Sequence, residues 1–236
     1  MANRGHDVTG RAALLFDLDG TLVDSDAQHL AAFQRAFARH GIELGAPEYA
    51  TKVMGASNAM IAEAFLSHLT PTQQAATIDA KEEDYRNTLE GVEPIAGAVA
   101  LLDFADRHGL KRAVVTNAPR ANAEKVLEAL GIGERLPIVI IGSELPRSKP
   151  DPLPYLTGLD RTGAEAARSV AFEDSLSGVR AAAAAGLAVV GLTTNLSAEV
   201  LIRAGATIAS SDFTDPRIRE LIAARCGVNP IERDPS

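Results

Sequence analysis

The chain has 236 residues, with 23 Lys and Arg against 31 Asp and Glu, which gives a formal net charge of −8. This acidic balance provides no non-specific attraction to nucleic acid or anionic lipid, so we expect neither nucleic acid nor a membrane as a partner. The composition, 46% hydrophobic and 23% charged, excludes a disordered or collagen-like chain. The single cysteine, Cys226, cannot form an internal disulfide, which favours a cytoplasmic location.

Six short apolar segments have the pattern of buried strands. They are continuous runs rather than alternations of apolar and polar residues, as is typical of parallel strands covered on both faces. Helical patterns that end at a glycine, such as 121–130 and 176–185, lie between them. This order predicts an α/β fold with a Rossmann-like, mostly parallel sheet. The expected strands are 12–16, 112–115, 137–141, 169–172, 188–192 and 206–209.

The interval between the first two strands is unusually long. It contains the 94 residues from 17 to 110, whereas one crossover helix normally suffices. A helix expected over 95–108 supplies that crossover, because its apolar residues fall on or near one face. Further helical patterns are then left over, at 27–40, 58–69 and 72–89.

These surplus helices predict a second domain. We expect an α/β core formed by residues 1–24 and 92–236, with a helical cap domain inserted at 25–91. The polar tail, 229–236, is expected to fray.

Two acidic pairs follow expected strands. Asp17 and Asp19 come directly after the first strand, in the segment DLDGTLVD, and Glu173 and Asp174 follow the fourth. Taken singly, each pair also fits a turn or a helix cap, where Asp is favoured for structural reasons. Open α/β sheets bind their ligands at the carboxyl ends of the strands, however, and both pairs are placed there.

The other two strand ends carry groups that suit an anion. Thr116 and Asn117 end the second strand just before a helix, and Lys149 lies between prolines after the third. Each has an ordinary explanation, as a helix cap or a surface lysine. Together with the acidic pairs on the same sheet edge, they predict a phosphate site. The carboxylates would repel one another without a cation, and oxygen ligands of this kind suit Mg²⁺.

In this order the four motifs resemble those of the haloacid dehalogenase superfamily of aspartate-dependent phosphotransferases. The resemblance covers the core and the inserted cap. It implies that Asp17 is the nucleophile that forms an aspartyl-phosphate and that Asp19 is the general acid and base. It also implies that Thr116 and Lys149 bind the transferring phosphoryl group, with Asn117 in support. The implied Mg²⁺ ligands are Asp17, the backbone carbonyl of Asp19, Asp174, and Glu173 directly or through water.

Within the superfamily, the chain is similar to the subgroup of phosphoglycolate phosphatases, small sugar phosphatases and β-phosphoglucomutases. The aspartate at position 19 argues for phosphate chemistry, since the dehalogenases and phosphonate hydrolases of the superfamily lack it. Ser25 and His29 follow the first motif much as in this subgroup, and His29 is either a substrate-binding residue or a hinge residue at the start of a helix. The other expected substrate-binding residues of the cap are Lys52, Ser57 and Asn58, and Lys52 is alternatively a solvated charge.

The resemblance implies a Mg²⁺-dependent phosphatase of a small phosphorylated metabolite, of the sugar phosphate or phosphoglycolate type. A phosphosugar mutase is the first alternative, but the cations that grip its second phosphate are replaced here by Met54 and Asn58, on either side of Gly55. A catalytically inactive protein that binds phosphorylated ligands is the second, and the intact motif residues argue against it. We expect a monomer or a weak homodimer.

Overall fold

The computed structural model describes residues 11–230 of the chain. Within them, six parallel strands form one sheet in the order β3-β2-β1-β4-β5-β6. The central strand is β1, whose Leu15 pairs with Ala113 of β2 and Ala171 of β4. This confirms the Rossmann-like α/β fold and all six expected strands, with their ends shifted by a few residues. The strands are β1 (Ala13–Phe16), β2 (Lys111–Thr116), β3 (Val139–Ile141), β4 (Val170–Glu173), β5 (Ala188–Leu192) and β6 (Ile208–Ser210).

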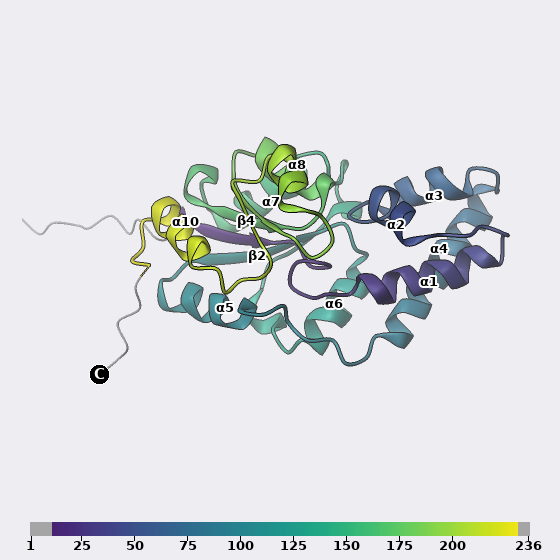
Figure 1. The fold of residues 1–236 in the computed structure, drawn as a ribbon, viewed down its shortest axis with the longest axis horizontal. Helices are drawn as coiled ribbons and strands as arrows, with labels where there is room; N and C mark the ends of the chain where they lie inside the picture. Colours follow the sequence, from purple (N-terminus) through teal and green to yellow (C-terminus); the bar gives the residue numbers. More distant parts are fainter. Residues whose placement is uncertain (1–10, 231–236) are drawn as a thin grey trace, which may run out of the picture.

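Helices cover both faces of the sheet (Figure 1). Side chains alternate along β1, so Leu14 and Phe16 pack into one apolar cluster while Ala13 and Leu15 pack into the other. Both faces of the sheet are therefore shielded from solvent, which explains why the strands appear in the sequence as continuous apolar runs. The first cluster includes α5 (Ala98–Arg107), α6 (Arg120–Ala129) and α10 (Pro216–Cys226), and the second includes α7 (Leu153–Thr162), α8 (Leu176–Ala184) and α9 (Ala198–Ala204).

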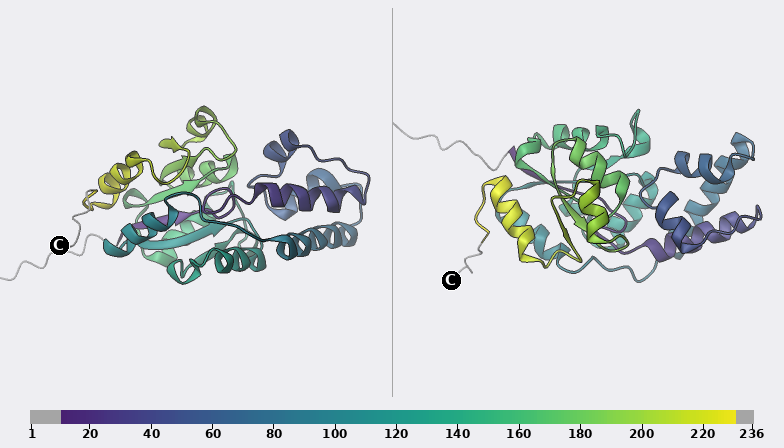
Figure 2. Two further views of the ribbon diagram at one scale, coloured as in Figure 1. Left: turned by 60° about the horizontal axis from the view of Figure 1, so that its bottom comes forward. Right: turned by 45° about the horizontal axis from the view of Figure 1, so that its top comes forward.

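Four helices between β1 and α5 form a separate group at one end of the molecule, which is visible in both views of Figure 2. They have a hydrophobic cluster of their own, which includes Phe33, Phe37 and Leu66. This group is the expected helical cap, while its exact boundaries at 25 and 91 stay a prediction. The helices are α1 (Asp26–Ala38), α2 (Ala46–Lys52), α3 (Asn58–Leu66) and α4 (Pro71–Thr88).

Helix α2 is absent from the sequence-based expectation. It has only seven residues, begins after Gly45 and contains Pro47 in its first turn. Its buried side chain is Tyr49, so the short segment carries too few apolar residues to produce a clear helical period.

The two segments that join core and cap lie side by side. Val23 forms an isolated antiparallel bridge with Pro94, and the Ile95 amide donates a hydrogen bond to the Leu22 carbonyl at 2.9 Å. The chain thus enters and leaves the cap at one place.

Two expectations, the core and the polar tail, fall partly on the ends of the chain. Residues 1–10 of the expected core and 231–236 of the expected polar tail lie outside the described residues. Across 11–230, none of the helices combines the length and the apolar character needed to cross a membrane.

Candidate active site

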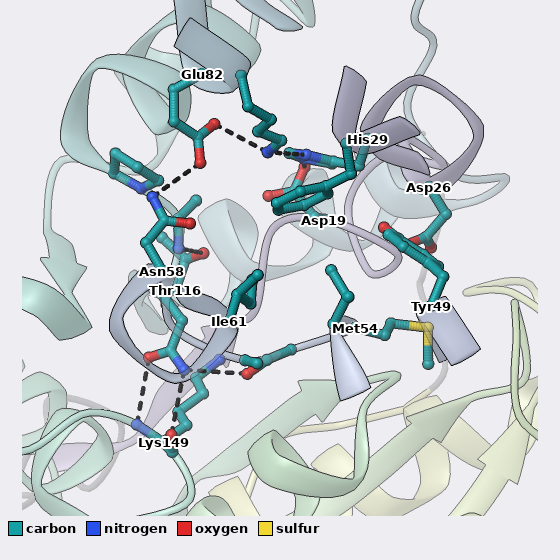
Figure 3. A pocket seen from close by; sticks show the side chains of 18 of the residues that line it. Asp19, Asp26, His29, Tyr49, Met54, Asn58, Ile61, Glu82, Thr116 and Lys149 are labelled. Atoms are coloured by element: carbon teal, nitrogen blue, oxygen red, sulfur yellow. Dashed lines mark hydrogen bonds and ion pairs between the residues drawn. The ribbon is translucent and has the colours of Figure 1, made fainter. Parts of the chain in front are cut away.

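A pocket lies at the carboxyl edge of the sheet, between core and cap (Figure 3). Asp17 directly follows β1, Thr116 is the last residue of β2, and Lys149 lies in the loop after β3. Side chains from α1, α3 and α4 line the cap side of the same pocket. The parallel strands therefore bring three of the four motifs to the pocket directly, and the fourth lies behind Asp17.

Three buried carboxylates gather at this edge. Asp17, Glu173 and Asp174 offer ligand oxygens that all lie within 4.8 Å of one another. Lys149 is 1% exposed, and its Nζ donates to Asp17 Oδ1 at 2.8 Å and to Glu173 Oε1 at 2.5 Å. One ammonium group cannot balance three carboxylates. A set of buried carboxylate oxygens with an uncompensated negative charge fits a hard divalent cation such as Mg²⁺.

The pKa values of these groups reflect the same excess of negative charge. Burial, reinforced by the charge of Glu173, raises the pKa of Asp17 to about 7 despite the nearby Lys149. Burial and the charge of Asp17 also raise the pKa of Asp174. Burial alone would lower the pKa of Lys149, but Asp17 and Glu173 outweigh it and raise that pKa. A bound cation would favour the ionised forms of both aspartates.

The turn after Asp17 depends on Gly20. This residue has a φ of 74°, and a Cβ atom there would collide with the carboxylate of Asp174. Thr21 Oγ1 then donates to Asp174 Oδ1 at 3.0 Å, and the Gly20 amide donates to the Val23 carbonyl at 2.7 Å. The left-handed glycine thus allows the loop to pass close over a buried carboxylate.

Asp19 has different partners from Asp17. Its Oδ1 accepts from Ser25 Oγ at 2.5 Å, lies 3.2 Å from His29 Nε2, and accepts from Tyr85 OH at 3.4 Å. Burial opposes ionisation of Asp19, but His29 and Ser25 outweigh it and lower the pKa. Groups at the start of α1 and on α4 therefore orient the second aspartate, so its position depends on the cap.

Hydrogen bonds to both carboxylate oxygens hold Glu173 in place. Tyr155 OH, on α7, donates to Glu173 Oε1 at 2.5 Å, and Ser175 Oγ donates to Oε2 at 3.2 Å. Because Lys149 donates to the same Oε1 atom, Glu173 fixes the ammonium group next to Asp17.

Thr116 and Asn117 do different work at the end of β2. Thr116 Oγ1 accepts from the Ala118 amide at 3.0 Å, which turns the hydroxyl proton toward other acceptors. Asn117 bridges two loops: its Nδ2 donates to the Gly55 carbonyl at 3.0 Å, and its Oδ1 accepts from the Lys149 amide at 3.2 Å. The Asn117 side chain therefore ties the loop of Lys149 to the cap.

The cap side of the pocket contains a buried ion pair. Lys81 Nζ, on α4, lies 3.0 Å from Glu82 Oε2 and 2.9 Å from His29 Nδ1. Glu82 also accepts from Asn58 Nδ2 at 2.8 Å and from Asn122 Nδ2, on α6 of the core, at 2.6 Å. Beside this network the wall is mostly apolar and consists of Phe33, Tyr49, Val53, Met54 and Ile61.

Comparison with known proteins now identifies the family. The sequence profile described as haloacid dehalogenase-like hydrolase matches residues 14–192. The chain belongs to the haloacid dehalogenase-like hydrolases. This confirms the resemblance seen in the motifs and the expectation of a hydrolytic enzyme.

Individual members of this family match over most of their length. A validoxylamine A 7'-phosphate phosphatase from Streptomyces hygroscopicus subsp. limoneus is 32% identical over 86% of this chain and 94% of its own. A phosphoglycolate phosphatase from Rhodospirillum rubrum is 33% identical over 85% of this chain and 87% of its own. The crystal structure of CbbY from Rhodobacter sphaeroides in complex with phosphate has a TM-score of 0.76 and 28% identity, covering 87% of this chain and 95% of that one.

The structure brings most of the candidate residues of this haloacid dehalogenase-like hydrolase together. The pocket is lined by Asp17, Asp19, His29, Asn58, Thr116, Asn117 and Lys149, with Glu173 and Asp174 next to Asp17.

Two expected substrate-binding residues of the cap lie elsewhere. Lys52 is at the end of α2, where its Nζ donates to the exposed Glu48 at 2.7 Å. Ser57 is the N-cap of α3 and accepts from the Met60 amide. Neither is among the described residues that line the pocket. The sequence order was sufficient to assign both to the cap, but not to decide which side of each helix meets the core.

Lys81 and Glu82 line the pocket, and sequence reasoning missed them. They stand in the polar run of α4 and look like a solvated face. A signal was nevertheless present: Ile78, Tyr85 and Leu89 recur at helical spacing and are buried. Positions 81 and 82 fall within that apolar stripe, so charges there had to be paired inside the protein.

Proposed function

We propose that this chain is a Mg²⁺-dependent phosphatase that hydrolyses a small phosphorylated metabolite through an aspartyl-phosphate. One observation carries the proposal: the buried Asp17 carboxylate, next to the Lys149 ammonium at 2.8 Å, opens into a pocket that the cap covers. The names of the validoxylamine A 7'-phosphate and phosphoglycolate phosphatases support phosphate ester hydrolysis on small molecules.

Asp17 is the nucleophile in this proposal. A carboxylate repels a phosphate dianion, so attack requires positive charge around the phosphoryl oxygens. Lys149 supplies one charge, while the Thr116 hydroxyl donates to the phosphoryl group. The residues that would hold Mg²⁺ are Asp17, Asp174, the backbone carbonyl of Asp19, and Glu173 directly or through water. When bound, this ion supplies two further positive charges next to the three carboxylates and the phosphate.

Asp19 moves the protons. A bound phosphate dianion opposes the effect of His29 and raises the pKa of Asp19, so that Asp19 enters the reaction protonated. As the phosphoryl group passes to an Asp17 oxygen, Asp19 gives this proton to the oxygen of the departing alcohol. It then takes a proton from the water that attacks phosphorus, and inorganic phosphate and the free Asp17 carboxylate result. Ser25, His29 and Tyr85 hold Asp19 in position for both steps.

The cap restricts the substrate to small molecules. It closes over the core through hinges near 24–27 and 90–94, excludes bulk water and surrounds the departing alcohol. A folded phosphoprotein is too large for its phosphate to reach the site when the cap is closed. We further propose a cytoplasmic enzyme that is a monomer or a weak homodimer.

The test is phosphate release by the full chain from p-nitrophenyl phosphate and a panel of phosphorylated sugars, polyols and glycolate. We expect turnover with Mg²⁺, none in excess chelator, and recovery when Mg²⁺ is restored. Asp19→Asn should slow the reaction by roughly 10²- to 10⁴-fold, the usual contribution of a general acid or base. Full turnover in chelator, or no turnover on any substrate, would contradict the proposal.

A further inference from the structure

The charges that line the pocket are unevenly distributed between its two ends. At the core end, Lys149 faces Asp17 and the phosphate site. The described lining residues that the cap contributes include two carboxylates, Asp26 and Glu82, one lysine, Lys81, and one histidine, His29, but no arginine. The part of the substrate that remains after phosphate transfer, the leaving alcohol, occupies this cap end.

Lys81 is not available for a second anion. Its ammonium is 2% exposed and lies 3.0 Å from Glu82 Oε2, so the two charges compensate each other. Burial also lowers the pKa of Lys81 even though Glu82 works in the opposite direction. Its third neighbour is His29 Nδ1 at 2.9 Å, which leaves the ammonium enclosed by protein groups.

Glu82 keeps room for a further hydrogen-bond donor. A carboxylate has about four lone-pair directions, and Glu82 accepts from three donors, on Asn58, Lys81 and Asn122. Figure 3 shows one Glu82 oxygen directed at the Asn58 amide beside the pocket, while the other faces the Lys81 ammonium. Burial opposes its ionisation, but Lys81 outweighs this and lowers the pKa of Glu82, so the side chain is an anion.

Asp26, the first residue of α1, adds a second negative charge on the other side of the pocket from Glu82 (Figure 3). Its carboxylate accepts from Tyr49 OH at 2.7 Å and from Asn195 Nδ2. Both partners are neutral, so no cation balances Asp26 directly. A carboxylate or a second phosphate arriving here would meet a net charge of −1 from Asp26, Glu82 and Lys81, with no unpaired lysine or arginine among the described lining residues of the cap, and it would lose its water on entry.

Another wall of the pocket is apolar and suits the carbon–hydrogen groups of a substrate. Val53, Met54 and Ile61 line it, and Figure 3 shows Met54 and Ile61 apart from the Glu82 and Asn58 pair. A compact polyhydroxylated ring or chain presents carbon–hydrogen faces to such a wall and hydroxyl donors to the other side.

We propose that the leaving alcohol of the substrate carries no second anionic group, being a neutral or ammonium-bearing polyol, and that Glu82 is the residue that enforces this choice. This inference rests on the proposed function and names its substrate class. Hydroxyl and ammonium groups donate to the free lone pair of Glu82, whereas a carboxylate or a second phosphate has no proton to donate to it and meets acceptor against acceptor.

Three two-carbon phosphates test the charge preference at constant length: 2-hydroxyethyl phosphate, 2-aminoethyl phosphate and 2-phosphoglycolate. Because its carboxylate cannot donate to Glu82 and meets the net negative charge of the cap lining, 2-phosphoglycolate should have a kcat/KM at least about tenfold lower than that of 2-hydroxyethyl phosphate. The value for 2-aminoethyl phosphate should equal or exceed that of the hydroxyethyl ester. Equal or better hydrolysis of 2-phosphoglycolate would overturn the inference and leave the phosphatase assignment intact. No release from these esters or from p-nitrophenyl phosphate would overturn the proposed function itself.

Glu82→Gln then assigns the effect to its residue. The change removes the charge and keeps the size, so the ratio of kcat/KM for 2-phosphoglycolate to that for 2-hydroxyethyl phosphate should rise about fivefold or more. The matched control is Glu83→Gln, which removes an equal charge from an exposed position on the same helix and should leave the ratio unchanged. Equal ratios in both variants would show that Glu82 does not set the preference.

A second variant keeps the proposal testable should Glu82→Gln not fold. Met54→Lys places a cation on the half-buried carbon wall and should raise the same ratio by a similar factor, about fivefold, while Met54→Leu should not. An unchanged ratio in a folded Met54→Lys variant would mean that charge at the cap end does not select the substrate.

Discussion

The core and cap ends of the pocket are built in opposite ways. In the core, the functional side chains lie at or just beyond strand ends, and three neighbouring carboxylates have one ammonium among them, which bonds to two of the three. In the cap, they project from helices, and the buried cation in the middle of α4, Lys81, is matched by its own neighbour, Glu82. The core is therefore incomplete without a cation, whereas the buried cation of the cap is already paired, and the cap offers hydrogen bonds and apolar surface. Reaction chemistry and substrate selection are separated along the same boundary.

The largest effect should follow from removing the nucleophile in the core. Asp17→Asn should lower kcat by at least about 10⁴-fold, since loss of a nucleophile costs this much in other covalent enzymes. Asp24→Asn is the matched control: it is the same change at an exposed residue of the same motif and should retain activity. Near wild-type turnover of Asp17→Asn would mean that another residue is the nucleophile and that the core does not carry the chemistry as proposed.

A second large effect is expected at Lys149. Lys149→Met should reduce kcat/KM by roughly 10²- to 10³-fold, the cost of losing one preorganised electrostatic group. Lys125→Met, at an exposed position of α6, provides the comparison and should have little effect. If both variants retain activity, the buried ammonium is structural only.

The charge excess of the core predicts a pH-dependent stability in the absence of metal. The pKa of Asp17 is about 7 in the folded protein and 3.8 as the reference value. Between these values the folded state binds a proton that the unfolded state lacks, so stability falls as the pH rises from about 4 to about 7. In chelator, Tm at pH 8 should lie roughly 5 °C or more below Tm at pH 5, and Mg²⁺ should close most of that gap.

The Asp17→Asn variant is the control for this measurement, because it removes the titrating group. Its metal-free Tm should vary less with pH and respond less to Mg²⁺. A wild-type Tm in chelator that rises from pH 5 to pH 8 would contradict the charge excess.

Removing one contact between core and cap should lower kcat/KM by a smaller factor. Ser177 Oγ donates to the Gly55 carbonyl at 2.7 Å, across the boundary. Ser177→Ala removes one hydrogen bond that holds the cap loop down, so kcat/KM should fall by about two- to tenfold. Ser211→Ala, at an exposed site of the core, should change it less. An unaltered value for Ser177→Ala would mean that other contacts suffice to keep the cap closed.

The smallest effect is expected at Lys52. Its ammonium is 55% exposed and pairs with Glu48 on the same helix, so Lys52→Met should change kcat/KM by less than about twofold. Lys81→Met is the instructive partner, since it leaves the buried Glu82 without its counter-charge and should cost about tenfold or more. If Lys52→Met lowered kcat/KM more than Lys81→Met does, Lys52 would be a substrate-binding residue after all.

Sequence reasoning succeeded where position along the chain determines position in space. Parallel strands bring their carboxyl ends to one edge, so the order of the motifs alone was enough to group Asp17, Thr116, Lys149 and Asp174. No comparable rule exists for the cap. Whether a residue on a short helix such as α2 faces the pocket depends on how the helix packs, and for this reason Lys52 was expected at the pocket and lies outside it.

Glu82 illustrates the other limit. A charged residue on a helix usually faces water, and its neighbours Glu83 and Asp84 strengthen that impression. Its burial depends on Asn58 and Asn122, which lie 24 and 40 residues away in the sequence. Such a pairing becomes visible only when three helices are seen together.

The bridge between Val23 and Pro94 has a consequence for the history of such proteins. Because the chain leaves and re-enters the sheet at adjacent points, the length and sequence of the inserted helices place no demand on the spacing of β1 and β2. Helices can be lengthened, shortened or redecorated without disturbing the strands that carry Asp17 and Thr116. The strand ends of the phosphate site can thus be kept while the cap changes in sequence and length. Relatives of this chain can then acquire new substrates by changes confined to one insertion.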